Sequence, residues 1–308
     1  MQTRQLGGDG PVLSLIGLGC NNFGMKLDPA QSKAVIDAAL EAGVTHLDTA
    51  EMYGQGRSEE YIGLALKGRR DEAVIATKFL PRPKDVPYEP GALRTRILEA
   101  CEGSLRRLQT DRIDLYYQHY VDPDAPFEEA QEALDELVRA GKVLHVASSN
   151  VTPESIAAAA EVAAEKSLAR FCGTQIEWNL LSRGVEAEIV PAARAHKIGI
   201  IPYFPLASGL LSGKYRRGAE YPEGSRFATM GFFADKVVND ENFAKVEALT
   251  AFAEERGHTV LELAIAWLAA QEGVASVIAG ATRPEQVATN AAAAAWTLTD
   301  EDLAALPL

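Results

Sequence analysis

Four side chains that can donate, accept or stabilise a proton occur early in the chain: Asp48, Tyr53, Lys78 and His119. A phenol titrates near pH ~10, which makes it too weak an acid to protonate a carbonyl oxygen at neutrality. An adjacent ammonium should lower that pKa, and a carboxylate beside the ammonium should keep it charged. An imidazole can orient a carbonyl oxygen or relay a proton. Together these groups suit proton transfer to the oxyanion that forms when a hydride reaches a carbonyl carbon.

Each of the four residues has a simpler explanation when it is taken alone. Asp48 could cap a turn together with the following Thr49, and Lys78 could be a solvated surface charge. His119 could be a buried histidine with satisfied hydrogen bonds, and Tyr53 could simply pack in its loop. The chemical interpretation is favoured because four complementary groups follow three consecutive predicted strands.

Eight short apolar segments alternate with helical patterns along the chain. The predicted strands are Leu15–Leu18, Val44–Leu47, Val74–Thr77, Ile113–Tyr117, Val143–Ala147, Gly173–Ile176, Ile198–Ile201 and Ser276–Ala279. Apolar strands that alternate with helices indicate a parallel sheet covered by helices. Eight such units favour closure, so we predict an α/β fold of the (β/α)8 TIM-barrel type, one domain over residues 1–308.

The helices between these strands carry start and stop signals. Asp28-Pro29 and Thr152-Pro153 each offer a cap followed by a first-turn proline, and Gly43 stands where a helix should end. Apolar residues at spacings of three or four predict one buried helical stripe. They are Leu93, Ile97, Cys101, Leu105 and Leu108.

Sites in such barrels lie at the carboxyl ends of the strands. The polar residues that follow the predicted strands are Asn21, Asn22, Asp48, Lys78, His119, Ser149, Asn150, Gln175, Tyr203 and the segment from Gly280 to Arg283. Residues 207–240 form an unusually long connection, of the kind that often serves as a lid or binding segment. Candidates to line an apolar mouth are Met25, Phe79, Tyr120, Trp178, Met230, Phe232 and Phe233.

Composition limits the possible partners and compartment. The 308 residues carry a net charge of −13, which argues against nucleic acid as a partner and means that an anionic cofactor needs a local basic pocket. The three cysteines lack metal-ligand spacing and are expected to be reduced. Neither a signal peptide nor a membrane-spanning segment is expected, so we predict a cytoplasmic protein.

Several segments, in order along nearly the whole chain, resemble those of the aldo-keto reductases. They are His46-Leu-Asp-Thr-Ala-Glu-Met-Tyr53-Gly with Gly56 and Ser58-Glu59, Ala76-Thr-Lys78, Thr110-Asp-Arg-Ile-Asp-Leu115 leading to His119, Ser148-Ser-Asn150, Gln175-Ile-Glu-Trp-Asn179, Tyr203-Phe-Pro-Leu206, Gly209-Leu-Leu-Ser-Gly-Lys-Tyr215, and Ala279-Gly-Ala-Thr-Arg-Pro-Glu-Gln286 with Asn290. The chain departs from the family at His145-Val-Ala-Ser and in its short C-terminal tail.

The resemblance implies an NADPH-dependent reductase of aldehydes or ketones. It assigns Asp48, Tyr53, Lys78 and His119 to a catalytic tetrad, with Tyr53 as general acid. The cofactor residues that it implies are Ser149, Asn150 and Gln175 at the nicotinamide amide, Tyr203 on the ring, Leu206, Ser208, Leu210, Ser212 and Lys214 along the pyrophosphate and ribose, and Gly280, Thr282, Arg283, Gln286 and Asn290 at the adenosine end.

The cofactor preference depends on Arg283, which precedes Pro284 at a predicted helix start. Backbone N–H groups and the helix dipole favour a phosphate there, and a guanidinium can bind the 2′-phosphate of NADPH. We therefore expect NADPH rather than NADH, and a small carbonyl compound as the other partner. The oligomeric state is left open.

Other functions remain open at this stage. An NAD(P)-linked aldose or alcohol dehydrogenase would use the same groups in the oxidative direction. A weakly catalytic nicotinamide-binding sensor or partner subunit is also possible, because the family includes channel-associated members. Outside the family, Lys78 could form a Schiff base in a lyase. A hydrolase could instead recruit His46, Asp48 and His119 as metal ligands.

Overall fold

Eight parallel strands close into a barrel in the computed structural model, which describes residues 1–83 and 85–307. The strands are β3 (Ile16–Gly19), β4 (His46–Asp48), β5 (Val74–Phe79), β6 (Ile113–Gln118), β7 (Val143–Ser149), β8 (Phe171–Glu177), β9 (Gly199–Tyr203) and β10 (Val277–Gly280). They pair in chain order, and β10 closes the ring between β9 and β3. All eight predicted strands and the (β/α)8 fold class are confirmed, and no strand end moves by more than two residues.

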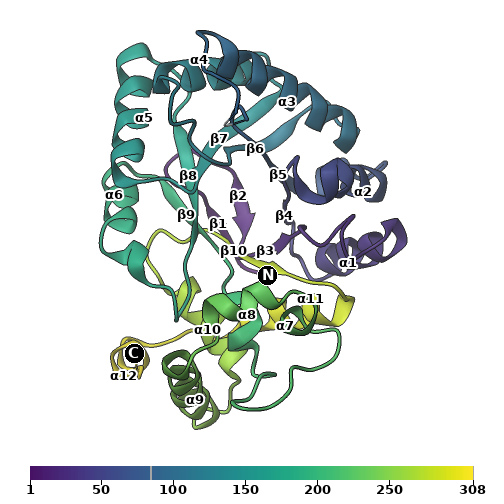
Figure 1. Cartoon of the computed structure of the whole chain (residues 1–308), viewed down its shortest axis with the longest axis vertical. Helices are drawn as coiled ribbons and strands as arrows, with labels where there is room; N and C mark the ends of the chain where they lie inside the picture. Colours follow the sequence, from purple (N-terminus) through teal and green to yellow (C-terminus); the bar gives the residue numbers. More distant parts are fainter. Residues whose placement is uncertain (84, 308) are drawn as a thin grey trace.

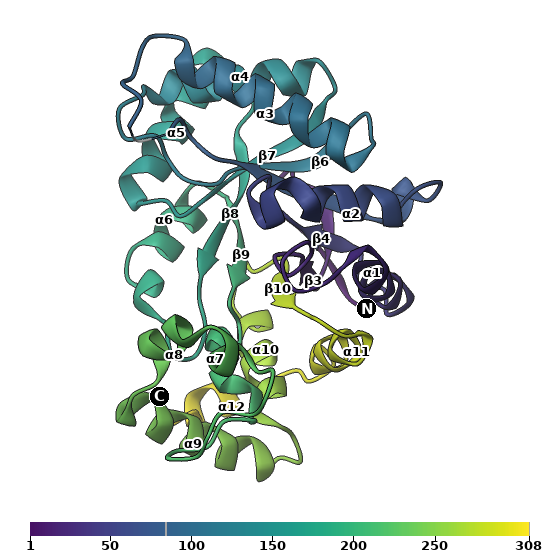
Figure 2. The ribbon, with the colours of Figure 1, turned by 45° about the vertical axis from the view of Figure 1, so that its right-hand side comes forward.

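Helices surround the strands, as Figures 1 and 2 show. They are α1 (Pro29–Glu41), α2 (Arg57–Ala65), α3 (Ala92–Leu108), α4 (Phe127–Arg139), α5 (Pro153–Lys166), α6 (Ile189–Ala195), α7 (Arg226–Thr229), α8 (Gly231–Val237), α9 (Asp240–Glu254), α10 (Val260–Ala269), α11 (Pro284–Ala293) and α12 (Asp300–Ala305). Helices α7 to α12 gather at one side of the barrel in both views. None of the helices in the described chain combines the length and apolarity needed to cross a membrane.

The predicted helix signals act as expected. Asp28 and Thr152 each close a capping box, with a proline at the first helical position. Gly43 adopts a φ of 75°, the left-handed conformation that glycine accepts at a helix end. The apolar stripe of α3 is buried along its whole length, which fixes this helix against the barrel.

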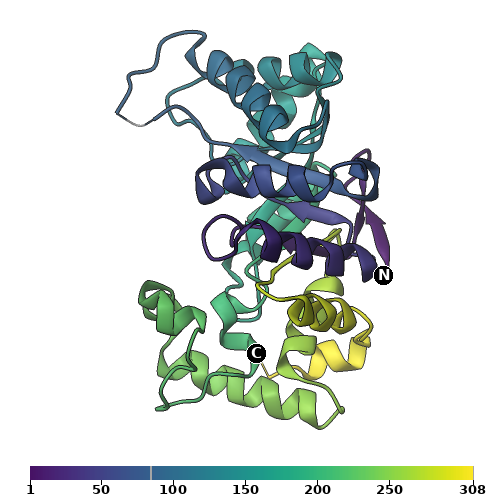
Figure 3. The ribbon, with the colours of Figure 1, turned by 90° about the vertical axis from the view of Figure 1, so that its right-hand side faces the viewer.

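A two-stranded antiparallel hairpin precedes the barrel and was not predicted. It consists of β1 (Thr3–Gln5) and β2 (Val12–Ser14), each too short for a recognisable alternation of side chains. Leu6 and Leu13 of this segment are fully buried in a cluster with barrel residues such as Tyr117. The hairpin therefore closes the amino-terminal end of the barrel, on the opposite side from α7 and α8 in Figure 3. The other end remains open for a site.

The connection after β9, predicted as a long loop over 207–240, contains short helical pieces. A 3-10 turn, η4 (Ala207–Ser212), is followed by α7, α8 and the start of α9. Ser225 caps α7 by accepting a hydrogen bond from Ala228 N. This segment lies beside the carboxyl ends of the strands and contributes to the cavity described next.

Candidate active site

The carboxyl ends of the strands open into a cavity of about 850 Å³. Its walls include every predicted site residue except Lys78, Leu210 and Arg283. Those that line it are Asp48, Tyr53, His119, Ser149, Asn150, Gln175, Tyr203, Leu206, Ser208, Ser212, Lys214, Gly280, Thr282, Gln286 and Asn290. Closure of the barrel thus brings residues more than 200 positions apart in sequence to one place.

Tyr53 stands at the start of a tight turn, η1 (Tyr53–Gly56), directly after the β4 loop. Gly54 has a φ of 57°, and a Cβ there would lie 2.8 Å from the carbonyl oxygen of Phe23. Only glycine fits both the backbone conformation and the space. No described residue hydrogen-bonds the Tyr53 hydroxyl, so this group is available to a molecule in the cavity.

Lys78 is fully buried beneath the cavity, where it connects Asp48 to Tyr53. Its Nζ lies 2.7 Å from Asp48 Oδ2 and donates a second hydrogen bond of 2.8 Å to the carbonyl oxygen of Thr49. The same Nζ lies 5.3 Å from the centroid of the Tyr53 ring. Asp48 also accepts a hydrogen bond of 2.8 Å from Gln175 Nε2, so both of its oxygens are held.

The pKa of Tyr53 differs from the expectation. Burial raises the pKa of this phenol, and the opposing effect of the Lys78 ammonium is smaller. Burial also disfavours the charge on Lys78, but the Asp48 carboxylate outweighs it and raises the pKa of Lys78. Tyr53 is therefore a protonated phenol at neutral pH, with a permanent cation beneath it. The predicted lowering was wrong in net direction, because the sequence argument included the charge but not the burial.

His119 follows β6 and faces the same cavity. Burial, assisted by the Lys78 cation, lowers its pKa to about 3, so the imidazole is neutral over the whole physiological range. Its ring lies edge-on to Tyr53, with centroids 6.2 Å apart, and stacks on Tyr120 at 4.7 Å. A neutral imidazole at this place can hydrogen-bond a polar group beside the phenol.

The residues assigned to the nicotinamide end form one connected network. Ser149 Oγ donates to the carbonyl oxygen of Gln175 at 3.0 Å, and Asn150 Nδ2 donates to Ser149 Oγ at 3.1 Å. Tyr203 donates its hydroxyl hydrogen to Asn150 Oδ1 at 2.9 Å. Asn150 adopts a φ of 53°, an unusual conformation for a non-glycine residue and one that often marks functional positions. These bonds fix the orientation of three amide and hydroxyl groups around the cavity.

Two of the residues assigned to the pyrophosphate, ribose and adenosine of the cofactor do not line the cavity. The side chain of Leu210 is fully buried in the core, because the kink at Ser208 and Gly209 turns it away from the cavity. Arg283 is the N-cap of α11 and is exposed, outside the cavity lining. At the same end, Gln286 Oε1 accepts from Thr282 N at 2.7 Å and shapes the loop before α11.

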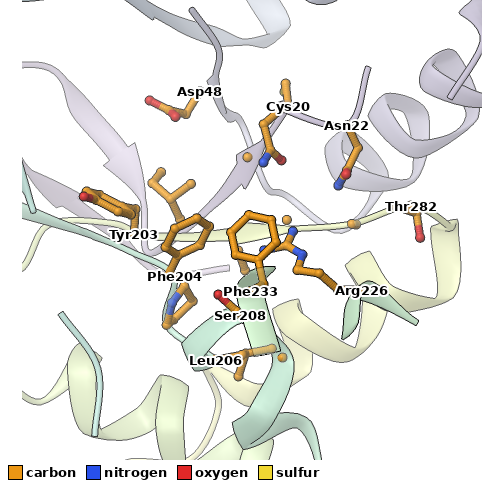
Figure 4. Close-up of a pocket in the computed structure, with 18 of the residues that line it drawn as sticks. Cys20, Asn22, Asp48, Tyr203, Phe204, Leu206, Ser208, Arg226, Phe233 and Thr282 are labelled. Carbon is orange, nitrogen blue, oxygen red and sulfur yellow. The ribbon is translucent and has the colours of Figure 1, made fainter. Parts of the chain in front are cut away.

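A cluster of three cations lines the cavity: Lys26, Lys214 and Arg226. Only Lys214 was predicted. Within the described chain, none of the three forms an ion pair. The pKa of Lys26 is lowered, mainly by burial and further by the positive charges of Arg226 and Lys214. Figure 4 shows Arg226 pointing into the space beside Phe233. This cluster is the local basic pocket that an anionic cofactor requires in a chain of charge −13.

The mouth residues were predicted with mixed success. Tyr120, Phe232 and Phe233 line the cavity, whereas the prediction was wrong for the other four. Phe79 follows the inward-facing Lys78 on β5, so it points to the helices and packs on Tyr116. Trp178 is buried against Trp267.

Met25 and Met230 also lie outside the cavity lining, because of their places in the connecting segments. Met25 is 60% exposed on the β3–α1 loop, and Met230 lies between α7 and α8. Met52 and Phe204 line the cavity but were not predicted to do so. Met52 adjoins the predicted site residue Tyr53, and Phe204 adjoins the predicted site residue Tyr203.

The geometry does not match the two chemistries weighed outside the family. A Schiff-base lysine must lose its proton, yet Lys78 has a raised pKa and is held by Asp48 and Thr49. Among the described residues, no three His, Cys, Asp or Glu side chains are grouped as metal ligands. His46 instead shares a hydrogen bond of 2.9 Å with Ser276 inside the barrel.

Comparison with known proteins agrees with the geometry. The model of the aldo/keto reductase family matches residues 15–307. Aldo-keto reductase YhdN of Bacillus subtilis is 35% identical over 309 residues, covering 98% of this chain and 91% of the relative. A probable voltage-gated potassium channel subunit beta of Oryza sativa subsp. japonica is 36% identical over 297 residues, covering 94% and 90%.

A third relative has an activity in its name. The L-glyceraldehyde 3-phosphate reductase of Escherichia coli (strain K12) is 33% identical over 302 residues, which cover 94% of this chain and 86% of the relative. The family reduces carbonyl compounds with a nicotinamide cofactor, and the match extends over nearly the whole barrel. The chain therefore belongs to the aldo/keto reductase family of oxidoreductases.

Proposed function

We propose that the protein reduces an aldehyde or ketone to an alcohol with NADPH, and that Tyr53 is the general acid. One observation carries the proposal: Asp48, Tyr53 and His119 line one cavity, with Lys78 directly beneath it, although the four residues come from three separate strand ends. The protonated phenol suits a proton donor, and the buried ammonium beneath it stabilises the phenolate left after transfer. Neutral His119 orients the carbonyl oxygen toward Tyr53.

The cavity residues fit a dinucleotide phosphate. When bound, the reduced nicotinamide supplies the hydride. Ser149, Asn150 and Gln175 would hold its amide, and Tyr203 would lie against its ring. Lys26, Lys214 and the half-buried Arg226 would meet the pyrophosphate, because cations that line a cavity without a carboxylate partner among the described residues favour an anionic ligand.

The preference for NADPH rests on Arg283. It precedes Pro284 at the N-terminus of α11, where backbone N–H groups and the helix dipole attract an anion. Its exposed guanidinium has no ion-pair partner within the described chain and can swing toward a 2′-phosphate. We infer that Arg283 distinguishes NADPH from NADH.

The test is consumption of NADPH with a panel of aromatic aldehydes, sugars, 2-ketoesters and methylglyoxal, followed by absorbance. Turnover with at least one carbonyl supports the proposal. Tight NADPH binding without turnover of any carbonyl would indicate a nicotinamide-binding sensor or partner subunit instead. A parallel assay with aldoses and NADP or NAD reports the oxidative direction.

A further inference from the structure

The ammonium of Lys78 lies over a second aromatic ring, that of Tyr117, to which the proposed mechanism gives no part. Tyr117 is the residue of β6 that pairs directly with Lys78 of β5, and both side chains are fully buried. Lys78 Nζ lies 5.4 Å from the centroid of the Tyr117 ring, almost the same distance as the 5.3 Å to the Tyr53 ring. A cation at this distance is attracted by the face of an aromatic ring, most strongly where water is excluded.

The hydrogen bonds of Lys78 leave part of its ammonium without a polar acceptor. An ammonium has three N–H donors. Among the described residues, two atoms accept from it: Asp48 Oδ2 and the carbonyl oxygen of Thr49. The two tyrosine rings lie beside the same Nζ, and of these Tyr53 lines the cavity whereas Tyr117 does not. Tyr117 therefore offers the ammonium an electron-rich surface inside the barrel, where water is absent.

The interior of the barrel holds the Tyr117 ring in one place. Tyr117 belongs to a buried cluster with Ala76 and Ala147, whose short side chains leave room for its ring. Leu6 and Leu13 of the N-terminal hairpin belong to the same cluster. Burial raises the pKa of Tyr117, so this phenol stays neutral and interacts with a cation through its ring rather than as a counter-ion.

We propose that Tyr117 is a positioning residue, whose ring holds the ammonium of Lys78 beside Tyr53 and thereby supports proton transfer from Tyr53. The inference rests on the proposed function, in which this ammonium stabilises the phenolate left on Tyr53. Tyr117 does not line the cavity, so it acts through Lys78 rather than on a bound molecule. Without the ring, the ammonium would have space to move, and the phenolate would lose part of its stabilising charge.

The test measures NADPH-dependent reduction of the carbonyl that is turned over fastest among aromatic aldehydes, sugars, 2-ketoesters and methylglyoxal. Tyr117→Leu removes the ring, and Tyr117→Met removes it with a flexible side chain that fills irregular space and preserves folding more readily. Each variant should lower kcat by roughly 5- to 30-fold, the equivalent of one cation–π contact shielded from water. The KM for NADPH and the affinity for NADPH, followed by fluorescence, should stay unchanged.

Two further variants separate this role from a structural one. Tyr117→Phe keeps the ring face, removes only the hydroxyl and should retain kcat. Tyr116→Leu is the matched control, because Tyr116 is the adjacent and equally buried residue of β6, but points to the helices and packs on Phe79. It should lower stability, measured by denaturant titration, as Tyr117→Leu does, and leave kcat unchanged.

Unchanged kcat in both Tyr117→Leu and Tyr117→Met would overturn the inference alone. So would a fall of kcat in Tyr117→Phe or Tyr116→Leu that equals the fall in Tyr117→Leu. If the unsubstituted protein oxidises NADPH with none of these carbonyl compounds, the proposed function is rejected and this inference with it.

Discussion

The ammonium of Lys78 lies 2.7 Å from the carboxylate of Asp48, and both side chains are almost entirely shielded from water. A buried pair of this kind is destabilising to break, because the remaining charge has neither water nor a partner. It also places a permanent cation beneath the phenol of Tyr53. The pair therefore links the stability of the barrel to its proposed chemistry.

Asp48→Asn should destabilise the protein by about 3–5 kcal/mol, because it leaves Lys78 uncompensated. The free energy of unfolding, measured by denaturant titration, checks this value. Glu241→Gln is a suitable control, since it removes the carboxylate of an exposed pair with Lys245 and should change stability by less than about 1 kcal/mol. A small effect of Asp48→Asn would show that the pair does not stabilise the fold.

The double variant Asp48→Asn with Lys78→Met separates stability from chemistry. Removing both charges should restore part of the stability lost in either single variant, because no uncompensated charge remains. Carbonyl reduction should nevertheless remain absent, since the phenolate of Tyr53 has lost its cation. If the double variant were active, the charge of Lys78 would have no part in the reaction.

Much of this arrangement could be predicted from the sequence, for physical reasons. The barrel strands are buried on both faces and therefore appear as apolar runs, and polar residues at their ends mark the site. Lys78 could be placed by its position after a strand. The same rule failed for Phe79, because adjacent residues on a strand point to opposite faces.

The remainder depends on tertiary structure. Lys26 lies in a loop and Arg226 begins the four-residue helix α7, segments too short for a periodic pattern, and only folding brings the two cations together. Similarly, the pKa of Tyr53 depends on how deeply the ring is buried, which neighbouring charges alone cannot indicate. The N-terminal hairpin escaped prediction because its strands are three residues long.

Stability should fall in acid because of His46, whose folded-state pKa burial lowers to about 4. The pKa of His46 in the unfolded chain is near ~6.5, so below that pH the unfolded chain binds a proton that the folded protein excludes. The free energy of unfolding therefore decreases as the pH is lowered from about 6.5 to 4. His46→Asn should lose roughly 2–3 kcal/mol less than the unsubstituted protein between pH 6.5 and 4.5. Unfolding titrations at both values provide the measurement, and parallel losses would refute this contribution.

Ionisation of His119 should not contribute to the pH dependence of carbonyl reduction. Its pKa of about 3 means that the imidazole stays neutral above pH ~5. The profile of kcat/KM should therefore show no ionisation near pH ~6.5 that disappears in His119→Asn. Such a step, present before substitution and absent after it, would show that His119 titrates in the working range.

Arg283→Ala should weaken NADPH binding by roughly 1.5–3 kcal/mol, the usual contribution of hydrogen bonds to a charged group. Affinity for NADH should scarcely change, because NADH lacks the 2′-phosphate. Fluorescence titration with each cofactor gives both values, and Arg139→Ala, an exposed arginine on α4, serves as control. Equal losses for NADPH and NADH would exclude the proposed role of Arg283.

Tyr53→Phe tests the central claim most directly, because it removes one hydroxyl and keeps the ring. The account predicts that kcat for NADPH-dependent reduction falls by about 10²–10⁴, the usual contribution of general acid catalysis. Binding of NADPH, followed by fluorescence, should persist with unchanged affinity. A variant that binds NADPH and still reduces the carbonyl at a near-normal rate would contradict the assignment of Tyr53 as the proton donor.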